Sequence, residues 1–436
     1  MISDTWLTDL LTDWLSWVQQ MGIDQLTLVL LVLLLVDAPR YAWSALIMAS
    51  VDLIREGARG RLPGPNEQKY DYSASISVLI AGYNEADTIA RTMESVWRCC
   101  PGVQMIVVDD GSTDGMAAAA EQWAGGRTGM IVVRRPHRGG KSSALNLGLH
   151  YATGEIVITV DADSLLEEHA IRELIQPMRD LRIAAVSGNV LAWNPFQSMA
   201  ARMQAYEYRQ TIFVSRMTRG RTGLLGIVSG AFGAFRREAL LNVGGWDVGP
   251  GEDGDIVLRL RKAGYQIGVA PYADCYTNVP TSWFRLFRQR CRWDRTVITF
   301  ECRKHVDMGN PVSRNFRLAD FVVLCERWIF NVVFVYSFWL GGVALILAGA
   351  SDPFYLTILL YLSSTLLELI QLLVLLLYSN RIRHDLTLAL VIPLYPAYQL
   401  FMKTVDVFAL TCEILFRESA DDNFVPEYVR RATWKF

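Results

Sequence analysis

Residues 155–163 read EIVITVDAD, in which a mostly apolar, β-branched run at residues 156–160 ends at two aspartates. Short runs of the same kind occur at residues 75–81 (SISVLIA), 104–108 and 130–133, and the segments between them have helical character. Such β-branched runs, without polar alternation, are typical of strands buried on both faces of a parallel sheet. The alternation of strands and helices predicts an α/β fold with a doubly wound sheet, which a further strand at residues 183–190 extends.

Polar side chains follow three of these strands directly. Asn84 and Glu85 come after the first strand, Asp110 after the second, and Asp161 with Asp163 after the fourth. Ligands of open α/β sheets bind beyond the carboxyl ends of the strands. The sequence therefore predicts one binding site that collects these residues.

The two aspartates after the fourth strand are candidates for a metal site. A pair of carboxylates with the spacing of Asp161 and Asp163 can hold Mg²⁺ or Mn²⁺ while a diphosphate supplies further oxygen ligands. An isolated D-x-D is more often a solvated turn, but its position after a buried strand favours the metal site. Asp110 is expected either to bind a nucleotide or to cap a helix, and both interpretations stay open.

Lys141 follows two glycines and begins a predicted helix, where glycine allows close approach of a ligand to the backbone. It is either a phosphate or uracil contact or an ordinary surface lysine. Glu252 and Asp253 lie in a glycine-rich acidic loop at residues 249–254, which is either solvated or the source of a carboxylate that takes a proton from an attacking hydroxyl. Asp253 is the candidate base.

Residues 289–293 read QRCRW, inside a basic and aromatic stretch at residues 283–304. On a helix, Gln289, Arg292 and Trp293 share one face, because positions i, i+3 and i+4 are neighbours. A donor amide, a guanidinium and an indole would suit a diphosphate beside a sugar. The alternative is an interfacial helix that binds anionic lipid, and the two roles are compatible.

Hydrophobic residues make up 52% of the 436 residues and concentrate in residues 24–54 and 318–416. Residues 328–348, 354–378 and 386–410 each approach the roughly 20 apolar residues that span a bilayer. The helix at residues 354–378 also carries a polar face, which is expected either to contact other helices or to line a polysaccharide path. Residues 1–22 have the pattern of an amphipathic helix in the membrane interface.

Net charge and cysteine content exclude some classes of protein. The formal net charge is −2, and no basic patch of a nucleic-acid-binding protein is apparent. The seven cysteines contain no C-x-x-C pair, which fits a reduced compartment without structural zinc or disulfides. The basic loop at residues 380–384 predicts a cytoplasmic position, and with it a cytoplasmic catalytic domain.

Taken together, these motifs resemble the processive, membrane-embedded glycosyltransferases of family 2, which make cellulose, chitin oligomers, hyaluronan and poly-N-acetylglucosamine. The resemblance runs from about residue 75 to residue 304. The segment VSGAFGAFRR at residues 228–237 and the pair Gly188-Asn189 are most similar to bacterial poly-N-acetylglucosamine and chitooligosaccharide synthases. The resemblance implies an A-type, Rossmann-like glycosyltransferase domain in the cytoplasm, inserted between N-terminal and C-terminal transmembrane helices.

The resemblance also implies residue roles. Asp110 would bind uridine with Lys141 near the uracil or phosphates, Asp161 would assist the donor, and Asp163 would hold the metal. The residues that would bind the donor also include Asn84 and Glu85. The acceptor and product would contact Ser229, Gly230, Glu252, Gln289, Arg292 and Trp293, and Asp253 would be the base. Two departures are Gly251, where relatives have threonine, and Asp294-Arg295 after the tryptophan.

The expected divisions are an interfacial helix at 1–22, transmembrane regions at 23–56 and 318–416, a glycosyltransferase domain at 73–280, interfacial helices at 281–317 and a cytoplasmic tail at 417–436. The sequence thus predicts a multi-pass enzyme of the bacterial inner membrane that polymerises a UDP-sugar, of the UDP-GlcNAc or UDP-glucose type, and exports the growing polysaccharide. Its expected partners are the donor, the polysaccharide acceptor, the lipid bilayer and a small membrane or periplasmic export protein, but no nucleic acid. The alternatives are a non-processive transferase acting on a lipid-linked acceptor and a catalytically inactive scaffold.

Overall fold

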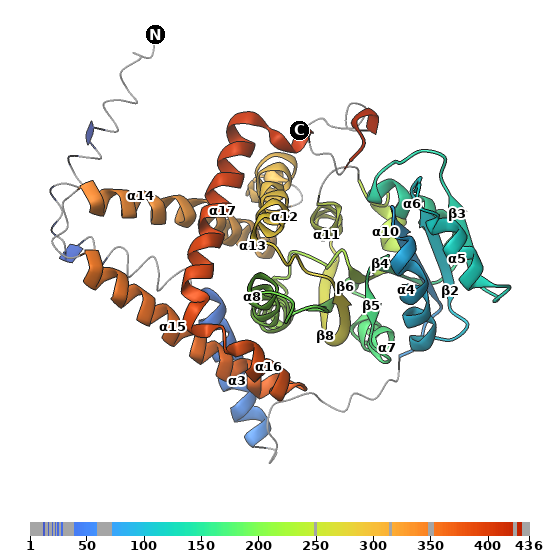
Figure 1. Ribbon diagram of the computed structural model, residues 1–436, viewed down its shortest axis with the longest axis horizontal. Coiled ribbons are helices and arrows are strands. Elements are labelled where there is room, and N and C mark those ends of the chain that lie inside the picture. Colours follow the sequence, from blue (N-terminus) through green and yellow to red (C-terminus); the bar gives the residue numbers. More distant parts are fainter. Residues whose placement is uncertain are drawn as a thin grey trace, which may run out of the picture.

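The computed structural model describes residues 39–58, 72–247, 251–313, 316–347, 353–421 and 425–429, with isolated positions between 12 and 28. A mixed sheet with helices on both faces adjoins a group of long helices (Figure 1). The strands are β1 Ile76–Gly82, β2 Gln104–Asp109, β3 Met130–Arg134, β4 Ile156–Asp161, β5 Leu165–Leu166, β6 Ile183–Ala192, β7 Phe232–Arg236 and β8 Gln266–Thr277.

The sheet has the order β3-β2-β1-β4-β7-β6-β8-β5. Strands β3, β2, β1 and β4 are parallel, which confirms the four parallel strands predicted from the apolar runs. Strand β3 lies at the edge of the sheet and is only partly buried, so the prediction of a buried strand was wrong there. Strand β6 extends the sheet as predicted, but antiparallel β7 lies between it and β4. The sheet is therefore mixed, because β7 runs antiparallel to both of its neighbours, β4 and β6.

The helices of the sheet domain are α4 Ala86–Cys99, α5 Met116–Ala124, α6 Lys141–Tyr151, α7 Ala170–Ile175, α10 Arg237–Asn242 and α11 Glu252–Lys262. Successive residues of a strand point to opposite faces, so Val78 and Ile80 pack with α4, α5 and α7, whereas Leu79 packs with α6, α10 and α11. Two apolar cores thus cover the sheet and hold its carboxyl edge, where the predicted ligand residues lie.

A second group of helices connects the sheet domain to the apolar segments. It comprises α3 Pro39–Gly57, α8 Met199–Tyr208, η2 Arg209–Ser215, α9 Arg216–Thr222, α12 Trp283–Thr296, η3 Val297–Lys304, α13 Leu318–Trp328, η5 Ile329–Val333, α14 Phe334–Leu347, α15 Pro353–Tyr378, α16 Ile382–Ala389 and α17 Tyr395–Phe416, with short 3₁₀ turns η1 Gln176–Arg179, η4 Val306–Gly309, η6 Ile392–Leu394 and η7 Glu418–Asp421. Figure 1 shows α14 and α15 extending away from the sheet.

Both of these helices pack on α17. The indole of Trp339 on α14 donates to the carbonyl oxygen of Lys403 at 3.4 Å, and Ser364 on α15 donates to Gln399 at 2.8 Å. Gln399 in turn donates to Glu368 at 2.8 Å. Within the described residues, the polar face of α15 is therefore used at least in part for contacts between helices, which was one of the two interpretations left open.

By length and composition, one helix of the described chain qualifies as a membrane span, at residues 357–378. The apolar segment at residues 386–410, expected as a single span, is not one continuous helix: α16 ends at Ala389 and α17 begins at Tyr395. Pro393 and Pro396 explain the break, because each lacks a backbone N–H and disfavours helical backbone before it. The predicted interfacial helix at 1–22 lies almost entirely outside the described residues.

Candidate active site

A cavity of about 270 Å³ opens at the carboxyl ends of β1, β2 and β4. Its wall includes Glu85 after β1, Asp110 after β2, Lys141 at the start of α6, and Asp161 with Asp163 after β4. Five of the residues predicted for the donor and metal thus meet in one cavity. The strand order accounts for this, because β2, β1 and β4 are neighbours and end at the same edge.

Asp110 organises the loop before α6. One carboxylate oxygen accepts hydrogen bonds from the Gly139 amide at 2.8 Å and from Arg135 at 2.9 Å, and the other accepts from the Gly140 amide at 2.7 Å. Burial raises the pKa of Asp110, while these donors and the nearby arginines oppose the rise. Asp110 therefore shapes the loop that carries Lys141 and also forms part of the cavity wall.

Asn84 and Glu85 have different positions despite being adjacent. The side-chain oxygen of Asn84 accepts from the Thr113 backbone amide at 2.9 Å, and the Asn84 backbone amide donates to Ser112 Oγ at 2.9 Å. Asn84 has a backbone φ of 58°. Asn84 thus joins the loops that follow β1 and β2. Glu85 lines the cavity, where burial raises its pKa and nearby aspartates add to that effect.

Lys141 links the donor carboxylates to the acceptor side. Its Nζ lies 2.5 Å from Asp161 Oδ1 and 3.6 Å from Glu252 Oε1, and donates to the Gly230 carbonyl oxygen at 3.2 Å. Burial opposes the charge on Lys141, but these carboxylates outweigh it and raise the pKa of the amine. Lys141 is thus a charged, enclosed group rather than an ordinary surface lysine.

The carboxylates of the cavity suit a hard cation. Burial raises the pKa of Asp163 to about 6, and the charges of Asp161 and Glu85 add to the rise. A divalent cation would relieve this repulsion between like charges. Across the described residues no group of three or more metal-binding side chains is close enough to hold an ion alone. The site therefore fits a cation shared between one or two carboxylates and substrate phosphates.

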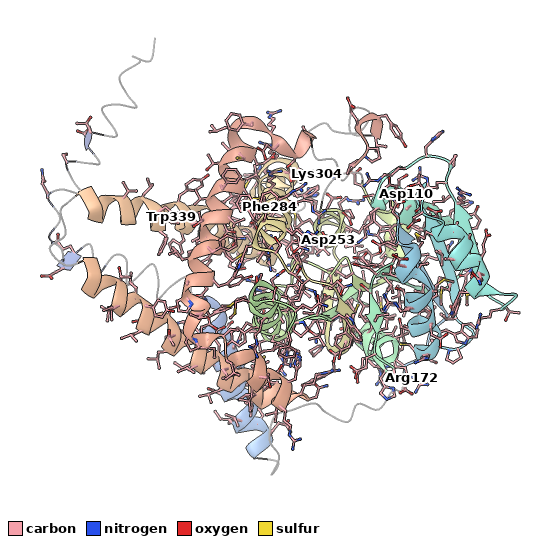
Figure 2. All side chains as sticks on the ribbon, viewed as in Figure 1. Asp110, Arg172, Asp253, Phe284, Lys304 and Trp339 are labelled. Carbon is pink, nitrogen blue, oxygen red and sulfur yellow. The ribbon has the colours of Figure 1, made fainter. Side chains whose placement is uncertain are left out.

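The acceptor side is built from the first turn of α11 and the loop before β7. A Cβ placed on Gly230 would lie 3.3 Å from Asp253 Oδ2 and 3.3 Å from Lys141 Nζ, so a side chain there would crowd both groups. Glu252 is buried, and burial raises its pKa while Lys141 opposes the rise. Figure 2 shows Asp253 between Asp110 and the helices that follow residue 283.

Helix α12 carries the predicted acceptor face. Trp293 keeps 39% of its surface exposed, and Arg292 is half-buried. The Gln289 amide oxygen is buried and accepts no hydrogen bond from the described residues, which leaves it available to a ligand hydroxyl. Arg290, which the sequence reasoning passed over, pairs with both carboxylate oxygens of Glu207 at 2.9 and 2.7 Å and lies 4.7 Å from the Trp293 ring centre.

Helix α12 also reaches α11 directly, and this contact explains the departure at Gly251. Gly251 has a φ of +85°, and a Cβ there would lie 2.6 Å from the Thr296 methyl group. The threonine of relatives would be strained here in backbone and in contact. At the second departure, Arg295 forms an ion pair with Glu418.

Sequence reasoning also missed Arg216 at the start of α9. Its guanidinium donates to Ser187 Oγ at 2.8 Å and to Ser229 Oγ at 2.7 Å, beneath the acceptor loop. Residues 216–221 read RMTRGR, which looks like an ordinary basic helix surface. The only signal available was its place shortly before the segment at residues 228–237.

The sequence that forms the donor side of this site matches the model of one protein family. Residues 77–244 match the model of glycosyl transferase family 2 and form a glycosyltransferase domain of that family. This range contains Asp110, Lys141, Asp161, Asp163 and the acceptor loop, so the predicted family is confirmed for the domain that builds the donor cavity.

Individual relatives are bacterial polysaccharide synthases. The chain is 29% identical over 271 residues to a poly-beta-1,6-N-acetyl-D-glucosamine synthase of Staphylococcus epidermidis, covering 60% of this chain and 64% of that protein. The Staphylococcus aureus (strain MSSA476) synthase is 31% identical over 226 residues, covering 51% and 54%. The matched segments thus span less than two thirds of the length of these relatives.

A solved structure shows the same fold. It is a mannosyltransferase from Pyrobaculum calidifontis in complex with GDP-Man and Mn²⁺, with a TM-score of 0.61, 20% sequence identity, and coverage of 88% of this chain and 99% of that one. The similarity supports the predicted A-type architecture of the mixed sheet.

Proposed function

We propose that the protein is a processive, inverting glycosyltransferase that polymerises a UDP-sugar, of the UDP-GlcNAc or UDP-glucose type, into a polysaccharide. The position of Lys141 carries this proposal. Its amine contacts Asp161 on the donor side and Gly230 on the acceptor side, and it lies 3.6 Å from Glu252 beside Asp253. The similarity to poly-N-acetylglucosamine synthases favours UDP-GlcNAc among these donors.

In the proposed reaction, Asp253 accepts the proton of the acceptor hydroxyl while the hydroxyl oxygen attacks the anomeric carbon. The bond from that carbon to the diphosphate breaks, UDP leaves, and attack from the opposite face inverts the centre. Lys141 and Arg292 supply positive charge to the site as negative charge develops on the diphosphate. Gln289 and Trp293 orient the terminal sugar, through a hydrogen bond and a flat apolar surface.

Asp163, with Asp161, is proposed to hold Mg²⁺ or Mn²⁺, which would offset the charge on the diphosphate. Chelation of divalent cations by EDTA is expected to stop sugar transfer, and added Mg²⁺ or Mn²⁺ to restore it. Full activity in excess EDTA, measured as release of UDP, would rule out the metal.

Export across the bacterial inner membrane is the second part of the proposal. It is supported by the apolar helix at residues 357–378 and by α14, which extends from the same group of helices. Arg381, just after α15, contacts Asp274 at 3.0 Å, so the chain returns to the sheet domain there. We propose that the sheet domain is cytoplasmic, that an out-and-back pair of helices follows it, and that a small export partner takes part.

The deciding experiment offers a panel of UDP-sugars to membrane vesicles and digests the product with linkage-specific hydrolases. A long polymer from one UDP-sugar is the expected result. Addition of a single sugar to a lipid would favour the non-processive alternative, and no UDP release with any sugar would favour the inactive scaffold.

A further inference from the structure

The guanidinium of Arg216 supports the acceptor loop, the residues just before β7 that include Ser229 and Gly230. Arg216 donates to the hydroxyls of Ser187 on β6 and Ser229, and the Ser229 amide donates to the same Ser187 hydroxyl at 3.1 Å. Ser187 and Ser229 are both buried, so water does not compete readily for these bonds. Removal of the guanidinium would leave the two hydroxyls without this donor and free the loop to shift.

The same guanidinium also lies near the candidate base, Asp253. Gly230, the residue after Ser229, lies against both Asp253 and Lys141. Burial lowers the pKa of Arg216 to about 10, whereas attraction to Asp253 opposes that decrease, so Arg216 stays charged at neutral pH. The other charged or titratable groups around this pair are Lys141 on α6, Glu252 on α11, Tyr208 on α8 and Arg219 on α9.

We propose that Arg216 is a positioning residue for glycosyl transfer. It holds Ser229, and with it Gly230, in place against Asp253. This inference rests on the proposed function, and it adds a residue of α9 to the acceptor side of the site, beside those of α11 and α12.

The test uses full-length protein in membrane vesicles and compares Arg216→Met with Arg216→Lys. We expect Arg216→Met to lower kcat about 100-fold, the size of effect that follows a displacement of about 1 Å at a reacting centre. KM for the UDP-sugar should change less than threefold, since the donor cavity is intact.

Arg216→Lys keeps the charge and loses the paired hydrogen bonds. It should recover kcat about tenfold relative to Arg216→Met, because the lysine amine can still donate to one of the two serine hydroxyls. Arg221→Met removes a like charge from the same helix, at a residue that pairs with Asp52 instead, and should show wild-type kcat.

The outcomes distinguish failure of this inference from failure of the proposed function. A wild-type protein that transfers no sugar would overturn the proposed function itself. An active wild type with an unchanged kcat in Arg216→Met, or with the same loss of kcat in Arg221→Met, would overturn only the role of Arg216. If Arg216→Met does not fold, an unchanged kcat in Arg216→Lys would overturn that role.

Discussion

Lys141 shows why neighbouring charges, rather than burial alone, decide the state of a group in this site. An enclosed amine ordinarily loses its proton more easily, yet two carboxylates lie within 4 Å of its Nζ. The resulting cation joins the donor half of the cavity to the acceptor half. A lysine after two glycines cannot be assigned this role from its type alone, because its partners come from β4 and α11.

Asp253→Asn should separate binding from chemistry. The amide cannot take the proton of the acceptor, so we expect the rate of polymer formation to fall roughly 10²- to 10⁴-fold, the range for loss of a general base. Binding of UDP, measured by calorimetry, should stay within about twofold, because Asp110 and Asp163 are untouched. Asp247→Asn, at a residue outside the cavity wall, is the control, and wild-type turnover by Asp253→Asn would refute the mechanism.

Gly251→Thr, which restores the residue of relatives, should destabilise this protein. A positive φ and the approach to Thr296 predict a loss of about 1–3 kcal/mol in the free energy of unfolding. Thermal unfolding in detergent would measure it. Gly254→Ala is the matched control: a Cβ there meets nothing within 4 Å, and alanine in a helix is favoured by about 0.5–1 kcal/mol. Equal melting temperatures for Gly251→Thr and wild type would contradict the assignment.

At the scale of elements, α11 and η3 are joined through Asp255. Its carboxylate lies 2.7 Å from His305 Nε2 and 2.7 Å from Lys304 Nζ, and it accepts from Arg259 at 2.8 Å. Lys304, labelled in Figure 2, also pairs with Asp247 at 2.6 Å. The bonds of Asp255 hold the first turn of α11, which carries Glu252 and Asp253, against η3, and so orient the base relative to α12.

Asp255→Asn should reveal this link through the pH dependence of stability. Burial opposes ionisation of Asp255, but the hydrogen bond from His305 and the charges of Arg259 and Lys304 outweigh it and hold its pKa below the usual range. The folded state therefore gains stability above the unfolded-state pKa of about 4 and loses it as pH falls below that value. We expect the variant to lose about 3 kcal/mol at pH 7.

The difference between the unfolding free energies of wild type and Asp255→Asn should shrink between pH 5 and pH 3, as urea titrations in detergent would record. Asp247→Asn is again the control, because the Asp247 side chain is 48% exposed and should change stability little. A difference that stays constant across this pH range would refute the charge-based account.

The sheet shows where sequence patterns stop being informative. Strands β1 to β4 are continuous apolar runs and were predicted directly. Strand β7 reads FGAFR and β8 reads QIGVAPYADCYT, and both were missed as strands. Glycine and proline weaken a strand pattern, and β7 lies inside the segment at residues 228–237, which was interpreted only through its family resemblance. The π-helical turns of η2, η3 and η5 carry no sequence signal of their own.

At the scale of the whole molecule, Arg209 on η2 ties the helices that follow β6 to α16, beyond the apolar helix α15. It forms two bonds of 2.8 Å with Asp385, and both side chains are almost fully buried. Ser379 donates to the same carboxylate at 2.5 Å. Because α15 ends at Tyr378 and α16 begins at Ile382, this pair fixes the point where the chain returns from the apolar helices.

Arg209→Met should cost about 3–5 kcal/mol of stability, because it leaves the buried Asp385 charge without its partner. The double variant Arg209→Met/Asp385→Leu should recover most of that loss, since well-packed apolar side chains can replace a buried ion pair. Melting temperatures in detergent and hydrogen exchange of α16 would measure both. A double variant as unstable as Arg209→Met would show that the pair is not the source of the loss.

The sequence by itself determined the parallel half of the sheet and the residues at its carboxyl edge, because apolar runs and strand-end carboxylates are local patterns. It also determined that α12 is a helix carrying Gln289, Arg292 and Trp293. Only the tertiary structure decided that Lys141 joins the two halves of the site, that Arg216 supports the acceptor loop, and that Arg209 meets a partner 176 positions away. Contacts between distant segments depend on how helices pack on the sheet, and no periodicity along the chain encodes them.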